Sequence, residues 1–109
     1  MKLQEIIEKL NLKVLTEIDD KEVSGVFISD MLSDVMSSAK SANIWITVQT
    51  HKNIVSAANL IDIAAIIVTH GKSVPQDTVE LANRFHVNIM STPMSVFELA
   101  SKLVEAGVK

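Results

Sequence analysis

The chain has no cysteine, and among its 109 residues there are only three glycines and two prolines. Without cysteine it cannot form disulfides, use a thiolate nucleophile or bind a metal through sulfur. This composition suits a reducing cytoplasm. The three glycines, Gly25, Gly71 and Gly107, are too few and too far apart for the Gly-x-Gly-x-x-Gly turn of dinucleotide-binding enzymes.

The sequence also lacks an excess of positive charge and a long apolar run. Its net charge is -3 and its isoelectric point is about 5.5, so it offers no basic field for a nucleic-acid backbone. The longest apolar run, residues 63–68, is far shorter than the roughly 20 residues that span a bilayer. Polar residues interrupt the N-terminal segment MKLQEIIEKL, which therefore lacks a signal-peptide core. We expect a cytoplasmic protein with neither nucleic-acid nor membrane partners.

What is present is an alternation of short strand-like and helix-like segments. Hydrophobic residues make up 48% of the chain and charged residues 21%, as in ordinary globular domains. Strands are predicted at 13–15, 23–28, 44–48, 63–68 and 87–91, and helices at 2–10, 30–39, 51–61, from Pro75 onwards and from 96 onwards. Alternation implies crossover connections. We predict an α/β fold, a single three-layer-like domain over 1–109, with a mainly parallel sheet of about five strands around a central 63–68 strand.

Polar side chains follow four of the predicted strands. In parallel α/β sheets ligands bind outside the carboxyl ends of the strands, where helix N-termini favour anions. Ser, Thr and Asp are also the usual helix caps, so a capping role is the alternative for each of them. The residues predicted at this edge are Ser29, Asp30, Thr50, His51, Thr69, His70, Gly71, Lys72, Ser73, Ser91 and Thr92.

The segment IIVTHGKSVPQD, residues 66–77, contains the Gly-Lys-Ser that ends a phosphate-binding P-loop. A P-loop needs an earlier glycine to open the backbone around the phosphate, and Ile66 occupies that position. Pro75 restricts the backbone where a P-loop helix would donate its N–H groups. ATP hydrolysis through this loop is not expected.

Two histidines suggest alternative chemistry. The segments VQTHK (48–52) and VTHGK (68–72) both carry Thr-His after a strand, which predicts equivalent positions for His51 and His70. With Asp30 they would supply three metal ligands for a small metal-assisted hydrolase. A Ser29-His51-Asp30 triad can be written, but no nucleophile elbow supports it. His86 is predicted at the opposite end of the sheet.

The larger apolar side chains have a simpler interpretation. Trp45 and the five methionines are expected to fill the core, with Met31 and Met36 the two methionines suited to an interface.

The chain resembles the DRTGG domain, and the related N-terminal domain of bacterial HPr kinase/phosphorylase, over nearly its whole length. The resemblance lies in DIAAIIVTHGKSVPQDTVELANRFHVNIMSTPMSVFELASKLVEAG (62–107), MKLQEIIEKLNLKVLT (1–16) and DDKEVSGVFISD (19–30). The shared pattern is a buried strand, a Thr-rich corner, a helix begun by proline, a further strand, and Ser/Thr-Thr before a capped helix. Asp20-Lys21 stands where the family name has Asp-Arg, and Thr69-His70-Gly71 where it has Thr-Gly-Gly.

The resemblance implies a regulatory and dimerising unit without catalysis of its own, here without an attached kinase or CBS module. We therefore expect a non-catalytic, homodimeric module that needs no cofactor and binds a small anionic ligand, a nucleotide or phosphometabolite. The expected ligand contacts are Thr69, His70, Gly71, Lys72, Ser91 and Thr92, with Thr50, His51 and Asp30 on the same edge. The two alternatives are the metal-assisted hydrolase and a protein-interaction subunit of a redox or signalling complex.

Overall fold

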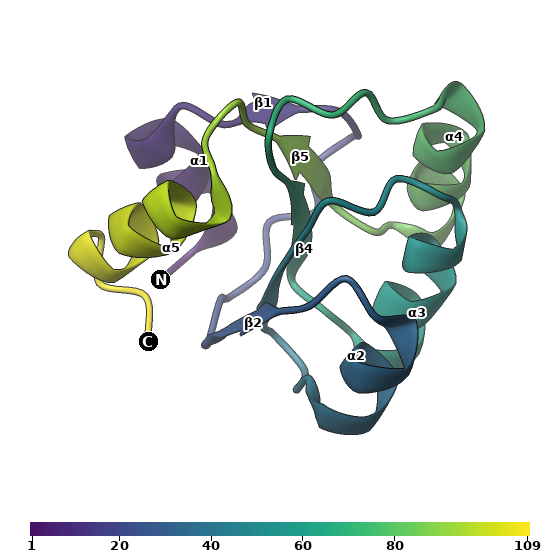
Figure 1. The fold of residues 1–109 in the computed structure, drawn as a ribbon, viewed down its shortest axis with the longest axis horizontal. Helices are drawn as coiled ribbons and strands as arrows, with labels where there is room; N and C mark the ends of the chain where they lie inside the picture. Colours follow the sequence, from purple (N-terminus) through teal and green to yellow (C-terminus); the bar gives the residue numbers. More distant parts are fainter.

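A computed structural model describes all 109 residues, and its centre is a five-stranded sheet in the order β1-β5-β4-β3-β2 (Figure 1). Strands β2 to β5 run parallel, and β1 pairs with β5 antiparallel. The strands are β1 Lys13–Val14, β2 Val26–Ile28, β3 Ile44–Thr47, β4 Ala65–Val68 and β5 Ile89–Ser91. The helices are α1 Leu3–Leu10, α2 Leu32–Ser38, α3 Asn53–Ile61, α4 Gln76–Phe85 and α5 Val96–Glu105.

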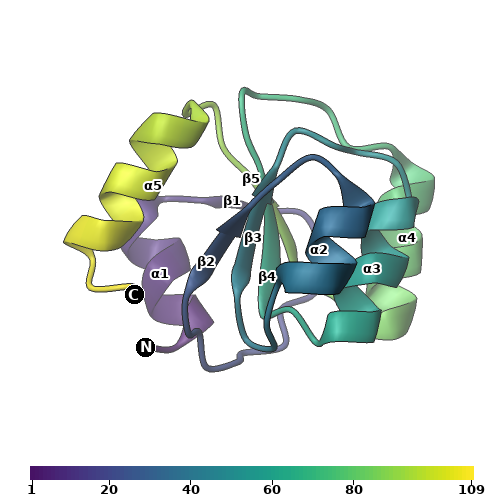
Figure 2. The same ribbon diagram turned by 60° about the horizontal axis from the view of Figure 1, so that its bottom comes forward.

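The helices form two layers, one on each face of the sheet (Figure 2). From β2 to β5 the chain always moves to the next strand in the same direction, and right-handed crossovers then place α2, α3 and α4 on one face. Helices α1 and α5 cover the other face (Figures 1 and 2). The predicted α/β class, the three layers and the central position of β4 are confirmed.

Two apolar cores meet at the central strands. Every residue of β3 and β4 is buried, because both faces of the sheet are covered. Alternate side chains point to opposite faces, so Ile46 and Ile67 enter the core beneath α1 and α5. Trp45 and Ile66 enter the core beneath α2, α3 and α4. The prediction that Trp45 fills the core is confirmed, but of the five methionines only Met90 is fully buried, and Met31 and Met36 are exposed.

Strand two is shorter than predicted. It begins at Val26 rather than at residue 23, because Gly25 has a φ of +80° and turns the backbone out of the extended conformation. A Cβ on Gly25 would lie 2.8 Å from the side-chain nitrogen of Asn43, so the glycine also permits a close approach. None of the five helices has the length and hydropathy of a bilayer-spanning segment.

Candidate functional site

At the carboxyl ends of β4 and β5, two neighbouring strands, the chain leaves the sheet toward opposite faces. The segment after β4 leads to α4 on one face of the sheet, and the segment after β5 leads to α5 on the other (Figure 2). In parallel sheets, connections that leave neighbouring strands toward opposite faces open a crevice between them, and ligands bind in such crevices. The expected ligand-binding crevice therefore lies between residues 69–75 and residues 92–95.

A tight turn shapes one wall of this crevice. His70 and Gly71 are its two central residues and both have positive φ, +60° and +63°. Two positive φ values in succession are typical of a type I′ turn, in which glycine is favoured. The turn is fastened to the opposite wall, because the N–H of His70 donates to the carbonyl of Met94 and the N–H of Gly71 donates to the carbonyl of Thr92.

A polar cleft of about 330 Å³ lies between the two walls. Two lysines line it, Lys72 from the β4–α4 segment and Lys13 from β1. Neither lysine lies within 4.0 Å of a carboxylate oxygen, so both positive charges are unpaired. The full lining is Lys13, Leu15, Gly71, Lys72, Ser73, Val74, Ser91, Thr92 and Pro93.

The cleft lining also carries unused hydrogen-bond donors. The backbone N–H groups of Ser73 and Val74 have no acceptor within the chain. The hydroxyls of Ser73 and Ser91 make no hydrogen bond within the chain either, whereas Thr92 Oγ1 accepts from the N–H of Met94. No carboxylate lines the cleft. Two cations with free hydroxyl and amide donors make a surface suited to an oxyanion.

Four of the nine expected ligand contacts line this cleft, Gly71, Lys72, Ser91 and Thr92, and so does Ser73, which was predicted at the same edge. Thr69 and His70 belong to the same turn but are not part of the lining. Thr69 is fully buried, and its hydroxyl is the one buried side-chain polar atom without a hydrogen-bond partner. His70 is exposed at the tip of the turn.

The other three predicted residues lie outside the cleft and make local hydrogen bonds. A carboxylate oxygen of Asp30 accepts from the hydroxyl of Thr47 (2.8 Å) and from the N–H of Val48 (2.9 Å). His51 Nδ1 accepts from the N–H of Asn53 at the start of α3. The carbonyl of Thr50 accepts from the hydroxyl of Thr78. Of the three, only His51 bonds at the start of a helix; Asp30 ties its loop to the end of β3, and Thr50 takes part through its backbone carbonyl.

The predicted equivalence of the two histidines is wrong. In the sheet Thr47 stands opposite Val68, an offset of 21 residues, whereas the Thr-His match implies 19. His51 consequently lies four residues beyond the end of its strand at Thr47, whereas His70 lies two residues beyond Val68.

The structure gathers no three His, Cys, Asp or Glu side chains in positions that could hold a metal. The metal-assisted hydrolase therefore has no ligand set. The Ser29 hydroxyl bonds to Asp34 rather than to His51, so the triad is not formed. His86 does lie at the opposite end of the sheet, at the C-terminus of α4, as predicted.

Lys13 is the site residue that sequence analysis missed. It lies 58 positions before Gly71 (71 − 13), and it reaches the cleft only because β1 pairs with β5 at the sheet edge, where Lys13 stands opposite Ser91. Nothing in its local sequence marks that placement.

A family model described as the DRTGG domain matches residues 5–106. The chain is also similar to the crystal structure of the CBS and DRTGG domains of the regulatory region of Clostridium perfringens pyrophosphatase, complexed with its activator diadenosine tetraphosphate. The TM-score is 0.74 at 18% sequence identity, over 95% of this chain and 46% of that one. This chain thus spans less than half the length of the crystallised regulatory region. No curated protein matches it, and the relation to HPr kinase/phosphorylase stays a prediction.

Proposed function

The chain belongs to the DRTGG domain family, and we propose that it is a regulatory module that binds a small anionic ligand, a nucleotide or phosphometabolite, and catalyses no reaction. The regulatory region of the similar pyrophosphatase is complexed with a nucleotide activator, and this supports a regulatory ligand-binding role for the present chain. A cytoplasmic location and a homodimeric state are part of the proposal.

The observation that carries the proposal is the cleft between the β4–α4 and β5–α5 segments, with its two unpaired lysines. Lys72 and Lys13 supply positive charge from two different elements, the β4–α4 segment and β1. Gly71, which has no side chain, leaves the backbone open to close approach, since the nearest heavy atom to an added Cβ would be 4.0 Å away. Ser73, Ser91 and the free N–H groups complete a set of donors for phosphate oxygens.

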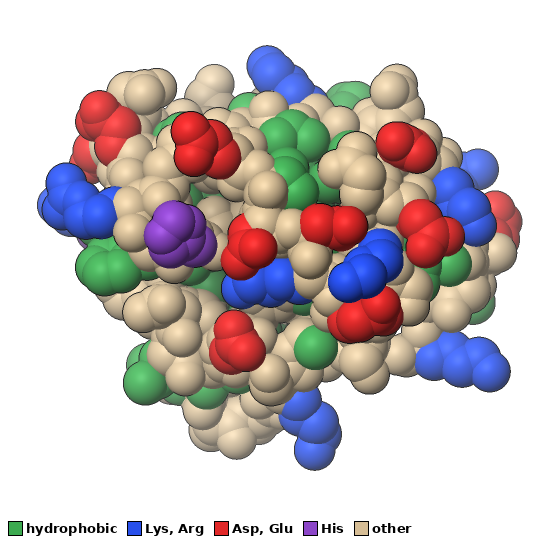
Figure 3. Space-filling view, turned by 180° about the vertical axis from the view of Figure 1, so that it is seen from behind, with side chains coloured by type: hydrophobic (Ala, Val, Ile, Leu, Met, Phe, Trp, Pro, Cys, Tyr) green, Lys and Arg blue, Asp and Glu red, His purple; other side chains and the backbone are tan.

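The back of the molecule carries no extended patch of basic side chains alone (Figure 3). Acidic and basic side chains are interspersed over the back of the molecule (Figure 3). Because the net charge is -3, attraction of an anion has to come from a local arrangement rather than from the overall field.

Thermal-shift measurements with inorganic phosphate, pyrophosphate, AMP and ATP test the proposal. A ligand that binds the folded state alone raises its stability by about 2.7 kcal/mol at a hundred times its Kd. Because a charge-assisted hydrogen bond contributes about 1.5–3 kcal/mol, we expect Lys72→Ala and Lys13→Ala each to weaken binding about tenfold or more.

Lys52→Ala is the matched control. Lys52 is exposed near the carboxyl end of β3 but does not line the cleft, so it should leave affinity unchanged. If no phosphate compound raises the melting temperature, or if all three lysine variants weaken binding equally, the cleft is not the site.

A protein-interaction subunit is the second candidate. It is favoured by exposed apolar side chains on the outer surface of α5, where Phe97 is 81% and Val104 is 71% exposed. Large apolar side chains grouped on a surface mark interaction sites more often than chance. Pull-down from native extract with the wild-type chain, compared with Phe97→Ser, would recover a partner only with the former if this candidate is correct.

A further inference from the structure

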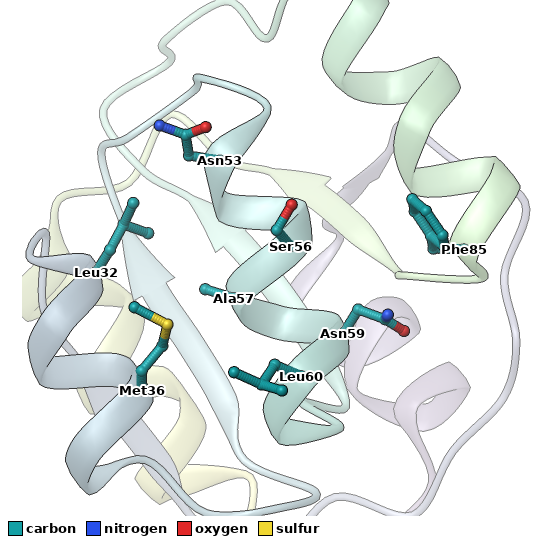
Figure 4. Close-up of a pocket in the computed structure, with 8 residues that line it drawn as sticks. All are labelled: Leu32, Met36, Asn53, Ser56, Ala57, Asn59, Leu60 and Phe85. Carbon is teal, nitrogen blue, oxygen red and sulfur yellow. The ribbon is translucent and has the colours of Figure 1, made fainter.

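The face of the molecule formed by α2, α3 and α4 has an apolar groove of about 450 Å³, separate from the polar cleft. Figure 4 shows it as a trough along α3, with Leu32 and Met36 reaching in from α2 and Phe85 from α4. Its lining is Leu32, Met36, Asn53, Ser56, Ala57, Asn59, Leu60 and Phe85. Of the two methionines predicted to suit an interface, Met36 lines the groove and Met31 does not.

Several lining residues are unusually exposed for their type. Leu60 is 70% exposed, Met36 is 46% and Phe85 is 45%. Leaving such side chains in water forgoes part of the free energy that their burial would contribute. A contiguous apolar groove of this kind marks a surface that another molecule covers.

The spacing of the α3 residues makes the floor of the groove suitable for a second helix. Asn53, Ser56, Ala57 and Leu60 follow the i, i+3, i+4, i+7 pattern and form one stripe. The small, exposed side chain of Ser56 stands at the middle of that stripe, above the buried Ala57, and allows the backbone of another helix to approach closely. The longer side chains stand at its ends.

Charge points to a second copy of the same chain as the occupant. In a two-fold symmetric contact each patch meets itself, so a charged residue at the centre would face its own charge. The eight residues that line the groove include no Asp, Glu, Lys, Arg or His. The groove can therefore meet its own copy without repulsion, and it offers no charge by which to select a different, charged partner.

The shape agrees with this choice. Leu32 lies beside the Asn53 end of α3, and Met36 lies beside the Leu60 end (Figure 4). If two α3 helices cross antiparallel about an axis near Ser56, the projecting Leu60 of each copy reaches the Leu32 and Asn53 end of the other. The face carries both the protruding side chain and the space that receives it.

We infer that the α2–α3–α4 groove is the interface of a two-fold symmetric homodimer in which α3 packs antiparallel against its copy. The inference rests on the homodimeric part of the proposed function and is independent of the anion cleft, which opens at another part of the surface. Both cleft segments remain free in such a dimer.

Sedimentation equilibrium of the ligand-free protein tests the inference. We expect a concentration-dependent dimer, and Leu60→Glu should raise its dissociation constant about tenfold or more, because two carboxylates would be buried without partners. Val104→Glu is the control, because Val104 is equally exposed but lies on α5; it should leave the dimer intact. Circular dichroism verifies that both variants fold.

Disulfide cross-linking tests the geometry of the interface. Because the chain contains no cysteine, an introduced cysteine is the only thiol in each copy. Under mild oxidation Ser56→Cys should form a disulfide-linked dimer, since the two copies of position 56 lie near the axis within disulfide reach. Ser101→Cys on α5 should not. A chain that stays monomeric at high concentration overturns both the dimer and the interface. A dimer that tolerates Leu60→Glu but is lost in Val104→Glu overturns the interface alone, and neither result bears on phosphate binding at the cleft.

Discussion

Gly25 and Gly71 both have positive φ, yet their surroundings differ. A Cβ at Gly25 would lie 2.8 Å from Nδ2 of Asn43, which is held by its 2.7 Å hydrogen bond to the carbonyl of Ser24. At Gly71 the nearest heavy atom would be 4.0 Å away. One glycine is required by both conformation and space, the other by conformation alone.

We expect Gly71→Ala to lower the free energy of unfolding by about 1–2 kcal/mol, the cost of a left-handed backbone for an L residue. Gly25→Ala adds the displacement of Asn43 and the loss of its hydrogen bond, about 1 kcal/mol more. Urea denaturation of the two variants measures both values. Equal losses would show that Asn43 moves aside freely and that the close approach contributes nothing.

Individual residues differ in how well the sequence predicts their roles. The structural role of Gly25 can be predicted from its sequence context, because a glycine within a β-branched segment indicates a bulge or a close approach. Asp30 and His51 could be placed at the carboxyl edge of the sheet, but not distinguished from helix caps, because the same side chains serve both purposes. The structure distinguishes them: Asp30 accepts from Thr47 and Val48 at the end of β3, whereas His51 accepts from the N–H of Asn53 at the start of α3.

Among the elements, α5 shows the closest agreement between sequence and structure. The Ser95-x-x-Glu98 spacing predicts a capping box, and both reciprocal bonds are present at 3.2 Å. A cap depends on residues within one helical turn, so local sequence is enough to find it. The position of α5 over the sheet depends on contacts with residues distant in the sequence, so local sequence does not predict it.

Ser95→Ala removes the hydroxyl that accepts from the N–H of Glu98. We expect the free energy of unfolding to fall by about 1 kcal/mol. Ser101→Ala, within the same helix, is the control and should be neutral or slightly stabilising, because alanine has the higher helix propensity. Thermal or urea unfolding measures both. If the two serine variants have the same stability, the capping box does not contribute.

Strand pairing marks the limit of prediction from local pattern. The alternation of elements predicts a mainly parallel sheet, but it does not predict that β1 joins the edge beside β5 in the antiparallel sense. That pairing brings Lys13 into the cleft beside residues 71–74. The Thr-His repeat fails for a related reason, since the pairing of β3 with β4 sets an offset of 21 residues rather than 19, and His51 lies farther beyond its strand end than His70 does.

At the scale of the whole molecule, the sheet joins two cores that share no residue. The central strands contribute alternate side chains to each, as Trp45 does on one face and Ile46 on the other. Loss of either helical layer would expose one face of β3 and β4, strands that depend on burial on both sides. The two cores should therefore unfold together.

Leu103→Ala tests this coupling from one side of the sheet to the other. Leu103 of α5 is fully buried in one core, and Trp45, the only tryptophan, is fully buried in the other. The substitution should lower the free energy of unfolding by about 2–5 kcal/mol. Tryptophan fluorescence and far-UV circular dichroism should report the same lowered urea midpoint, because a domain of this size unfolds in one cooperative transition.

Val104→Ala, at the exposed neighbouring position, should change stability by no more than about 0.5 kcal/mol. A fluorescence midpoint that stays at the wild-type value while the circular dichroism transition divides into two would show that the layers unfold independently, and that the sheet does not couple them.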